Sequence, residues 1–309
     1  MTRFPLPLCG TCAELRDCLA VGAARPAYPR CRTPLLDTSL GRLRELVEWA
    51  TPAPVDRLVA VIELLLARFA RDRRRYSEIF EWSLAWDGER GLHTLRFSSA
   101  FPGWASDGGS IRATLEATAR AFGPEASALW ERTALLLGHP DVAQPLVGLA
   151  DDGPRFKLYV QLHDRPREAT ALASALTGLE VPNLDGRLHL VGLDQGGDAA
   201  SKLYVIPART THTPLSDELG VTRGLVVHRA RAGAWTATEL DFGLADNDLT
   251  EADLLLAARA HYPEAVAHYS ALARRFGVAL RRVSLGLDRP RLVLYYVLTD
   301  SDAKPAAGA

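Results

Sequence analysis

The sequence predicts an α+β protein in which helices surround a ten-stranded antiparallel β-barrel. Five segments carry alternating apolar residues on both sides of a short turn, as β-hairpins do. Helical segments separate the hairpins at a period of roughly 45–50 residues, which indicates an internally repeated architecture. Hairpins give antiparallel pairs, and ten such strands close into a barrel without exposed edges. An open sheet with helices on one face would use the same elements and is the alternative.

The chain of 309 residues is expected to divide into three regions. Residues 1–37 are rich in Pro, Cys and Gly and predict an irregular arm. Residues 38–300 predict a single barrel domain, and the tail at 301–309 is disordered by composition. The barrel region begins with two expected helices, at 39–50 and at 55–75, where apolar residues recur at helical spacing.

The arm holds all four cysteines of the chain: Cys9, Cys12, Cys18 and Cys31. The first two form C-x-x-C, but the other two are irregularly spaced and no histidine lies nearby. A structural zinc site needs four ligands that converge on the metal. Reduced thiols are therefore the preferred interpretation, zinc or a redox disulfide is the alternative, and no metal ligand is assigned.

The remaining elements follow in order along the chain. The hairpins are expected over residues 80–101, 147–162, 187–206, 224–244 and 279–298. The helices between them are expected over residues 110–122, 125–137, 166–178, 250–260 and 263–276. The third and fourth hairpins are joined by ARTTHTPLSDE, which is expected to be a polar connection.

Composition narrows the function classes. The net charge of −1 and the sequence pI of about 6.7 do not favour nucleic acid as a partner. The longest apolar run, at 59–70, is too short to span a bilayer and is interrupted by Glu63. The first residues lack the features of a signal peptide, so that a cytoplasmic protein without membrane contact is expected.

Three expected strands carry a cation and a tyrosine on the same face, because side chains two or four residues apart on a strand point the same way. The pairs are Lys157 with Tyr159, Lys202 with Tyr204, and Arg291 with Tyr295. A single pair of this kind is more often a solvated lysine beside a packed tyrosine. Three pairs on equivalent strands instead predict a barrel lumen lined with positive charge and aromatic rings.

Five segments, in this order, resemble the aromatic prenyltransferases of the αββα-barrel fold, also called the ABBA fold or PT-barrel. They are FEWSLAW (80–86), LRF (95–97), FKLYV (156–160), GLDQGGDAASKLYVIP (192–207) and RLVLYYV (291–297). The likeness is to the dimethylallyltryptophan synthases and to the shorter cyanobactin peptide prenyltransferases. It covers roughly residues 55–298, and the set of segments carries it rather than any single motif.

The resemblance implies that an allylic diphosphate, dimethylallyl or geranyl, donates its prenyl group to an electron-rich acceptor. A Trp- or Tyr-like side chain of a peptide natural product is the expected acceptor, and a small aromatic metabolite is the alternative. Glu81 would take the acceptor's proton as general base. The donor would be bound by Arg96, Lys157, Tyr159, Lys202, Tyr204, Arg291 and Tyr295, whose cations neutralise the leaving diphosphate and whose rings face the allyl cation.

Other chemistry finds little support. D-D-x-x-D does not occur, since Asp151–Asp152 and the pair Asp246 and Asp248 lack a third carboxylate at the required spacing. No cofactor is therefore expected to be required, with Mg²⁺ at most an auxiliary ion. A G-x-S-x-G elbow does not occur either, which disfavours a hydrolase of that type.

Two departures from the resemblance concern the cations. The fourth hairpin, WTATELDF (235–242), lacks the lysine–tyrosine pair, and no arginine is expected at the cationic position of the ninth strand. Two other functions use the same residues differently. One is a non-catalytic barrel that binds an apolar or anionic ligand, and the other is a peptide-interaction module that uses the cysteine-rich arm.

Overall fold

The structure is a computed structural model that describes residues 45–46, 65, 80–88, 91–101, 104–150, 155–195, 201–231 and 233–298. The predicted cysteine-rich arm at 1–37 and the tail at 301–309 lie outside the described residues, and so do nearly all residues of the helices expected at 39–50 and 55–75. The domain boundaries at 37 and 300 therefore stay predictions.

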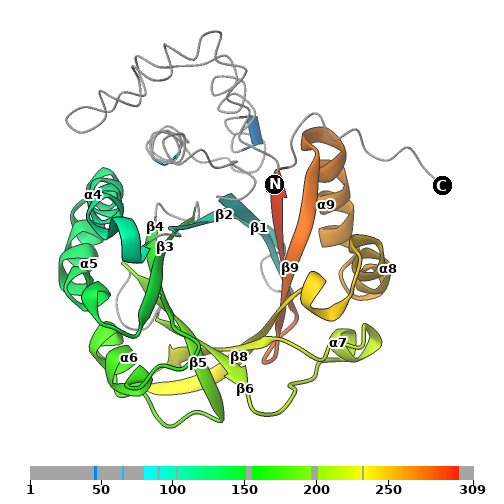
Figure 1. Ribbon diagram of the computed structural model, residues 1–309. Helices are drawn as coiled ribbons and strands as arrows, with labels where there is room; N and C mark the ends of the chain where they lie inside the picture. The colour runs from blue at the N-terminus through cyan, green and yellow to red at the C-terminus, as the bar shows by residue number, and fades with distance from the viewer. Residues whose placement is uncertain are drawn as a thin grey trace.

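Ten antiparallel strands form a closed barrel in which each strand pairs with its neighbours along the chain and β1 pairs with β10 (Figure 1). This confirms the predicted fold class and excludes the open sheet. The strands are β1 (Phe80–Asp87), β2 (Gly91–Ala100), β3 (Val142–Ala150), β4 (Arg155–Leu162), β5 (Gly186–Asp194), β6 (Lys202–Pro207), β7 (Leu225–Arg231), β8 (Ala234–Gly243), β9 (Val278–Gly286) and β10 (Arg291–Leu298).

The described helices lie outside the barrel and follow it around (Figure 1). They are α4 (Trp104–Phe122), α5 (Pro124–Ala134), α6 (Ala169–Thr177), α7 (Pro214–Glu218), α8 (Glu251–His261) and α9 (Pro263–Phe276), with short 3-10 turns η4 (Leu136–Gly138) and η6 (Ala245–Asn247). Five of the six described helices coincide with predicted ones to within three residues at each end, except that α4 begins six residues before its predicted start.

The alternation along the strands sorts side chains between the helices and the lumen. On β4, Phe156, Leu158 and Val160 are fully buried in the layer between barrel and helices, where Phe156 meets Phe122 of α4. The intervening side chains face the other way, into the barrel. The apolar core is thus a cylinder around the barrel, and polar residues are left for its interior.

The connection ARTTHTPLSDE is not irregular throughout, because its second half forms the short helix α7. Thr213 caps this helix: its hydroxyl accepts a hydrogen bond from the Ser216 amide, and the Ser216 hydroxyl receives one from the Thr213 amide. Pro214 occupies the first helical position, where its missing N–H costs nothing. The prediction missed a capping box in which serine replaces the more common glutamate.

Among the described residues, no helix has both the length and the apolar character needed to cross a membrane.

Candidate active site

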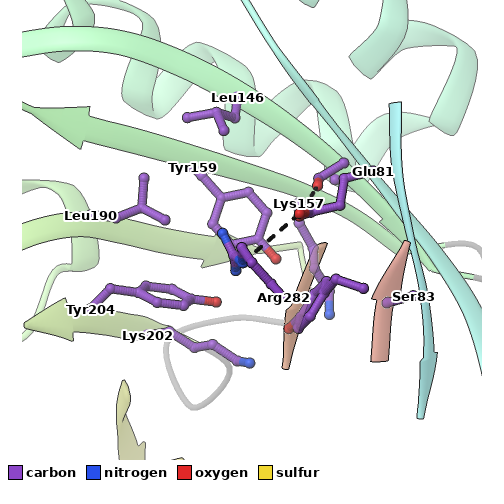
Figure 2. Close-up of a pocket in the computed structure, with 12 residues that line it drawn as sticks. Glu81, Ser83, Leu146, Lys157, Tyr159, Leu190, Lys202, Tyr204 and Arg282 are labelled. Carbon is purple, nitrogen blue, oxygen red and sulfur yellow. Dashed lines mark hydrogen bonds and ion pairs between the residues drawn. The ribbon is translucent and has the colours of Figure 1, made fainter. Parts of the chain in front are cut away.

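The barrel encloses a cavity of about 80 Å³ that is lined by side chains from eight of the ten strands or their ends. Figure 2 shows Lys157, Tyr159, Lys202 and Tyr204 converging on it from β4 and β6, with Arg282 and Glu81 from the opposite wall. The predicted convergence of basic and phenolic side chains is therefore present. Gly148, opposite Lys157 on β3, also lines the cavity and leaves room for the lysine.

The cations gather at the end of the barrel that carries the hairpin turns. Lys202 and Arg291 are the first residues of β6 and β10, and Lys157 is the third residue of β4. Their exposed fractions are 8%, 9% and 9%, so that they are lumen residues rather than surface charges. The Lys157 ammonium lies 3.4 Å from a carboxylate oxygen of Asp194, its partner across the β4–β5 ladder.

At the same end of the barrel, the carboxylate of Glu239 on β8 lies among several cations, and this residue is 2% exposed. Its carboxylate accepts hydrogen bonds from Arg229 of β7 and lies 3.6 Å from the Lys202 ammonium and 3.5 Å from the Arg291 guanidinium. Burial acts to raise the pKa of Glu239, but the three cations outweigh it and hold this pKa well below its usual value. Glu239 is therefore an ionised carboxylate inside the barrel.

The same environment acts on Lys202 in the opposite sense. Burial and the neighbouring Arg229 lower the pKa of Lys202 well below its usual value, against the attraction of Glu239. The neighbouring cations thus repel the Lys202 ammonium more strongly than the carboxylate of Glu239 attracts it. An anion that enters the lumen would relieve this imbalance and favour the ammonium form.

Three tyrosines form the middle of the lumen wall. The rings of Tyr159 and Tyr204 meet edge to face with centroids 6.2 Å apart, and the Lys202 ammonium lies 6.0 Å from the Tyr204 ring. The Arg282 guanidinium lies 4.8 Å from the ring of Tyr295. Burial raises the pKa values of Tyr204 and Tyr295 well above the usual phenol value. These phenols therefore stay neutral and can donate hydrogen bonds.

Gly192 lets the Tyr159 ring lie flat against β5. A Cβ at position 192 would stand 3.0 Å from Cε1 of that ring and 3.4 Å from the Cβ of Lys202. We expect Gly192→Ala to destabilise the protein by about 1–3 kcal/mol, the usual cost of overpacking. Gly109→Ala on α4, where a Cβ meets nothing within 4 Å, is the control and should stabilise by about 0.5–1 kcal/mol. Urea unfolding measures both, and equal stability of Gly192→Ala and the wild type would contradict the assignment.

Glu81 is the second residue of β1 and therefore lies towards the end of the barrel opposite the hairpin turns, where helices connect successive hairpins. This end is called the helix end below. One of its oxygens is 3.8 Å from Nε of Arg282, and the other is 3.5 Å from the hydroxyl of Ser98 (Figure 2). Along β1, Asp87 is the residue that lies opposite Arg291, which places Glu81 six residues away, on the order of 20 Å along the strand. Glu81 and Arg291 therefore occupy different levels of the lumen, while Lys157 and Lys202 line the same cavity as Glu81.

Arg282 also connects the half-buried Glu81 to a fully buried acid. Its guanidinium donates a hydrogen bond of 2.9 Å to Asp241 of β8, which is 2% exposed. Burial raises the pKa of Asp241 from 3.8 to about 6, although Arg282 acts to lower it. An acid with a raised pKa binds more protons in the folded state, so that this residue lowers the unfolding free energy as the pH rises from about 4 to about 6.

A pH series tests this effect. The shift of roughly 2 units in the pKa of Asp241 corresponds to about 3 kcal/mol lost between those pH values. We expect the stability of Asp241→Asn, measured by urea unfolding from pH 4 to pH 7, to lack this decline. Asp246→Asn, a change at an exposed aspartate, should keep it. Parallel curves for the wild type and Asp241→Asn would contradict the prediction.

The structure corrects the expectation about the ninth strand, because Arg282 of β9 lines the cavity. Arg229, Glu239 and Asp241 were not predicted as lumen residues from the sequence. The alternation of WTATELDF did contain a signal, since Glu239 and Asp241 share one face and interrupt an otherwise apolar strand end. The second strand of the fourth hairpin, which lacks the lysine–tyrosine pair, carries these two carboxylates instead.

The remaining predicted donor contact is Arg96, which is placed here by the strand pairing of its backbone. It pairs with Ser83 of β1, whose side chain lines the cavity, and with Ala150 of β3. Its register position is therefore that of a lumen residue, and its side chain lies outside the described ones.

A larger cavity of about 580 Å³ lies at the helix end of the barrel. It is lined by the ends of β6 and β8 and the start of β7, and Arg282 borders both this mouth cavity and the lumen cavity. Polar side chains of several kinds face it, including those of Thr210, Arg223 and Asp246. The mouth cavity can therefore take a polar molecule whose inner end reaches Arg282.

Among the residues that the structure describes, no three His, Cys, Asp or Glu side chains form a group that could hold a metal ion. The expectation that Mg²⁺ is at most auxiliary stays a prediction.

No protein-family model and no curated protein sequence matches the chain. Solved structures match its fold. One is 6-dimethylallyltryptophan synthase from Micromonospora olivasterospora in complex with DMASPP and Trp, with a TM-score of 0.60, 16% identity, and coverage of 84% of this chain and 96% of that chain. Another 6-dimethylallyl tryptophan synthase matches with a TM-score of 0.61 and 18% identity, over 85% of this chain and 95% of that chain.

PriB, in a binary complex with product diphosphate, is a third match, with a TM-score of 0.58 and 19% identity over 85% of this chain and 95% of that chain. These likenesses extend over almost the whole length of the matched chains and include the closed ten-stranded barrel. The chain therefore has the αββα-barrel fold of the aromatic prenyltransferases.

Proposed function

We propose that the protein transfers a dimethylallyl group from its diphosphate to an electron-rich aromatic ring. The observation that carries the proposal is the order of side chains along the lumen. Buried cations lie at the hairpin end, three tyrosines follow, and Glu81 lies towards the mouth. This is the order in which a leaving diphosphate, an allyl cation and an acceptor's proton would need them.

The cations act on the step that breaks the C–O bond of the donor. The electron pair leaves with the diphosphate, and Lys157, Lys202 and Arg291 stabilise the growing negative charge through charge-assisted hydrogen bonds in a low-dielectric site. The faces of Tyr159 and Tyr204 can stabilise the allyl cation, at about 0.5–2 kcal/mol for each ring. Their packing also excludes water that would otherwise capture the cation.

The acceptor ring then forms the new C–C or heteroatom–C bond with the allyl cation. Glu81 takes the proton that the acceptor must lose. This is either the proton of the attacked ring position or an N–H or O–H proton, whose removal makes the ring more electron-rich. Arg282 and Ser98 orient the two oxygens of Glu81 for this role.

The sizes of the two cavities support a short donor and an extended acceptor. The lumen cavity of about 80 Å³ favours a five-carbon prenyl group over geranyl. The mouth cavity of about 580 Å³ offers space for polar groups attached to the reacting ring, such as the main chain of a tryptophan residue in a peptide. A peptide acceptor is therefore the first choice, and free tryptophan or another small aromatic is the second.

The test combines each donor with each acceptor class. Dimethylallyl or geranyl diphosphate is incubated with tryptophan, with indole, and with short linear and cyclic peptides that contain Trp or Tyr, and products are detected by mass. We expect a monoprenylated product with dimethylallyl diphosphate, less or none with geranyl diphosphate, and turnover that persists in EDTA. A donor that binds but yields no product with any acceptor would instead support the non-catalytic barrel.

A further inference from the structure

Glu239 occupies the centre of the cation cluster that the proposed function assigns to the donor. One carboxylate oxygen accepts hydrogen bonds from Arg229, one of them 3.1 Å long, and lies 3.5 Å from Arg291. The other oxygen lies 3.6 Å from the Lys202 ammonium and accepts a hydrogen bond of 3.2 Å from Ser284. One buried carboxylate thus engages three cations from three different strands.

A diphosphate and a carboxylate use the same partners. Both are anionic acceptors of charge-assisted hydrogen bonds, and guanidinium groups bind either of them well. A diphosphate that contacts Lys202 and Arg291 would approach the Glu239 carboxylate closely, and two anions in a buried site repel each other strongly. The pKa of Glu239 lies well below its usual value, so that protonation at neutral pH does not remove this repulsion.

Arg229 can hold the Glu239 carboxylate when the diphosphate binds Lys202 and Arg291. It contacts Glu239 through both Nε and Nη2, whereas Lys202 and Arg291 approach it at longer distances, and Arg229 lies next to Lys202 across the β6–β7 ladder. The carboxylate can therefore give up Lys202 and Arg291 and still accept two hydrogen bonds from Arg229 on one of its oxygens. No buried charge is then left uncompensated.

We propose that Glu239 is a built-in counter-anion of the donor site, which an entering diphosphate displaces from Lys202 and Arg291. The inference rests on the proposed function, because it takes these cations to be the diphosphate site. Glu239 then holds the cations in place in the empty barrel, lowers the affinity for the donor, and speeds release of the pyrophosphate product by returning to its partners.

The test measures binding of inorganic pyrophosphate by calorimetry to the full-length wild type and to Glu239→Gln. We expect the variant to bind at least tenfold more tightly, because the repulsion is removed while all three cations remain. Asp288→Asn is the matched control: it removes one negative charge at the same end of the barrel, from a side chain that pairs with Arg231 instead. Its pyrophosphate affinity should equal that of the wild type.

Thermal unfolding gives a second reading on the same proteins. Without pyrophosphate the variant should be less stable than the wild type, because three buried cations lose a shared partner. Added pyrophosphate should raise its midpoint more than that of the wild type. A folded variant that binds pyrophosphate equally or more weakly would show that Glu239 merely orders the cations, and the inference would be wrong.

A crystal structure of the wild type with pyrophosphate decides the matter if Glu239→Gln does not fold. We expect pyrophosphate oxygens on Lys202 and Arg291, with the Glu239 carboxylate beyond hydrogen-bonding distance of both and still on Arg229. Pyrophosphate bound beside an unmoved carboxylate would overturn the inference and leave the proposed function standing. If neither the wild type nor the variant binds pyrophosphate at millimolar concentration, the proposed function itself fails.

Discussion

Replacing Lys202 with methionine is expected to lower kcat/KM for dimethylallyl diphosphate by roughly two to three orders of magnitude. Losing one member of a buried, hydrogen-bonded charge contact costs about 2–5 kcal/mol, and each 1.4 kcal/mol is a factor of ten. Methionine keeps the length and packing of the side chain beside Tyr204 and removes the charge. Steady-state kinetics with a fixed acceptor, together with calorimetric titration of pyrophosphate, measure the effect.

The control for this variant is Arg231→Met. It removes a cation from the same end of the barrel, but the Arg231 side chain is 54% exposed and pairs with Asp288, so that turnover should be unchanged.

The pH dependence of binding gives a further check. The wild type should bind pyrophosphate less tightly as the pH rises, because a lysine with a lowered pKa loses its proton at lower pH. Lys202→Met should show a weaker pH dependence. Wild-type kinetics in the methionine variant would exclude Lys202 from the donor site.

Replacing Glu81 with glutamine should lower kcat by about 10²–10⁴, the usual contribution of general base catalysis. Glutamine keeps the shape of the side chain and its contact with Ser98 but cannot accept the acceptor's proton. Because Glu81 contacts Arg282 and Ser98 and stands at a different level from Arg291, pyrophosphate should bind to the variant as it does to the wild type. The expected signature is therefore a loss in kcat with little change in donor affinity.

The control for this variant is Glu264→Gln, on α9 outside the barrel, where Glu264 accepts a hydrogen bond from the Trp86 indole. Its kcat should match that of the wild type. If Glu81→Gln turns over at the wild-type rate, proton removal belongs to another group or to solvent. A loss of pyrophosphate binding in Glu81→Gln would show that the charges of the lumen act as one unit rather than at two levels.

The sequence predicted those parts of the fold that depend on local patterns. Each hairpin has an alternation of apolar residues and a turn of its own, and ten strands of this kind leave few ways to bury the apolar faces. The inward placement of Lys157, Lys202 and Tyr204 followed from the same alternation. Closure of the barrel confirmed that these side chains from distant strands share one interior.

Arg282 was missed because its position depends on a bulge. The register between β9 and β10 shifts between Tyr295 and Tyr296, and simple alternation does not reveal where such an extra residue stands. Arg281 and Arg282 are adjacent in the sequence, and the strand pairing decides which of them faces the lumen. Tyr295 pairs with Arg282, and the guanidinium lies over its ring.

Glu239 was missed for a different reason. Its three cationic partners come from β6, β7 and β10, up to 52 positions away along the chain, so that no local pattern relates them. An acidic residue in an apolar strand end is ambiguous until the partners are known, because buried carboxylates are stable only when they are paired. The arrangement became visible once the strands were placed around one axis.

The pairing of β1 with β10 has a consequence for how this site comes into being. Arg291 enters the cluster from the last strand, and the ladder that seats it joins residue 87 to residue 291. Contacts between such distant parts of a chain form slowly, because loop closure must precede them. A nascent chain that has only its first nine strands therefore cannot close the barrel between β1 and β10. A chain truncated before residue 291 should leave the acidic and basic side chains of the cluster exposed to water.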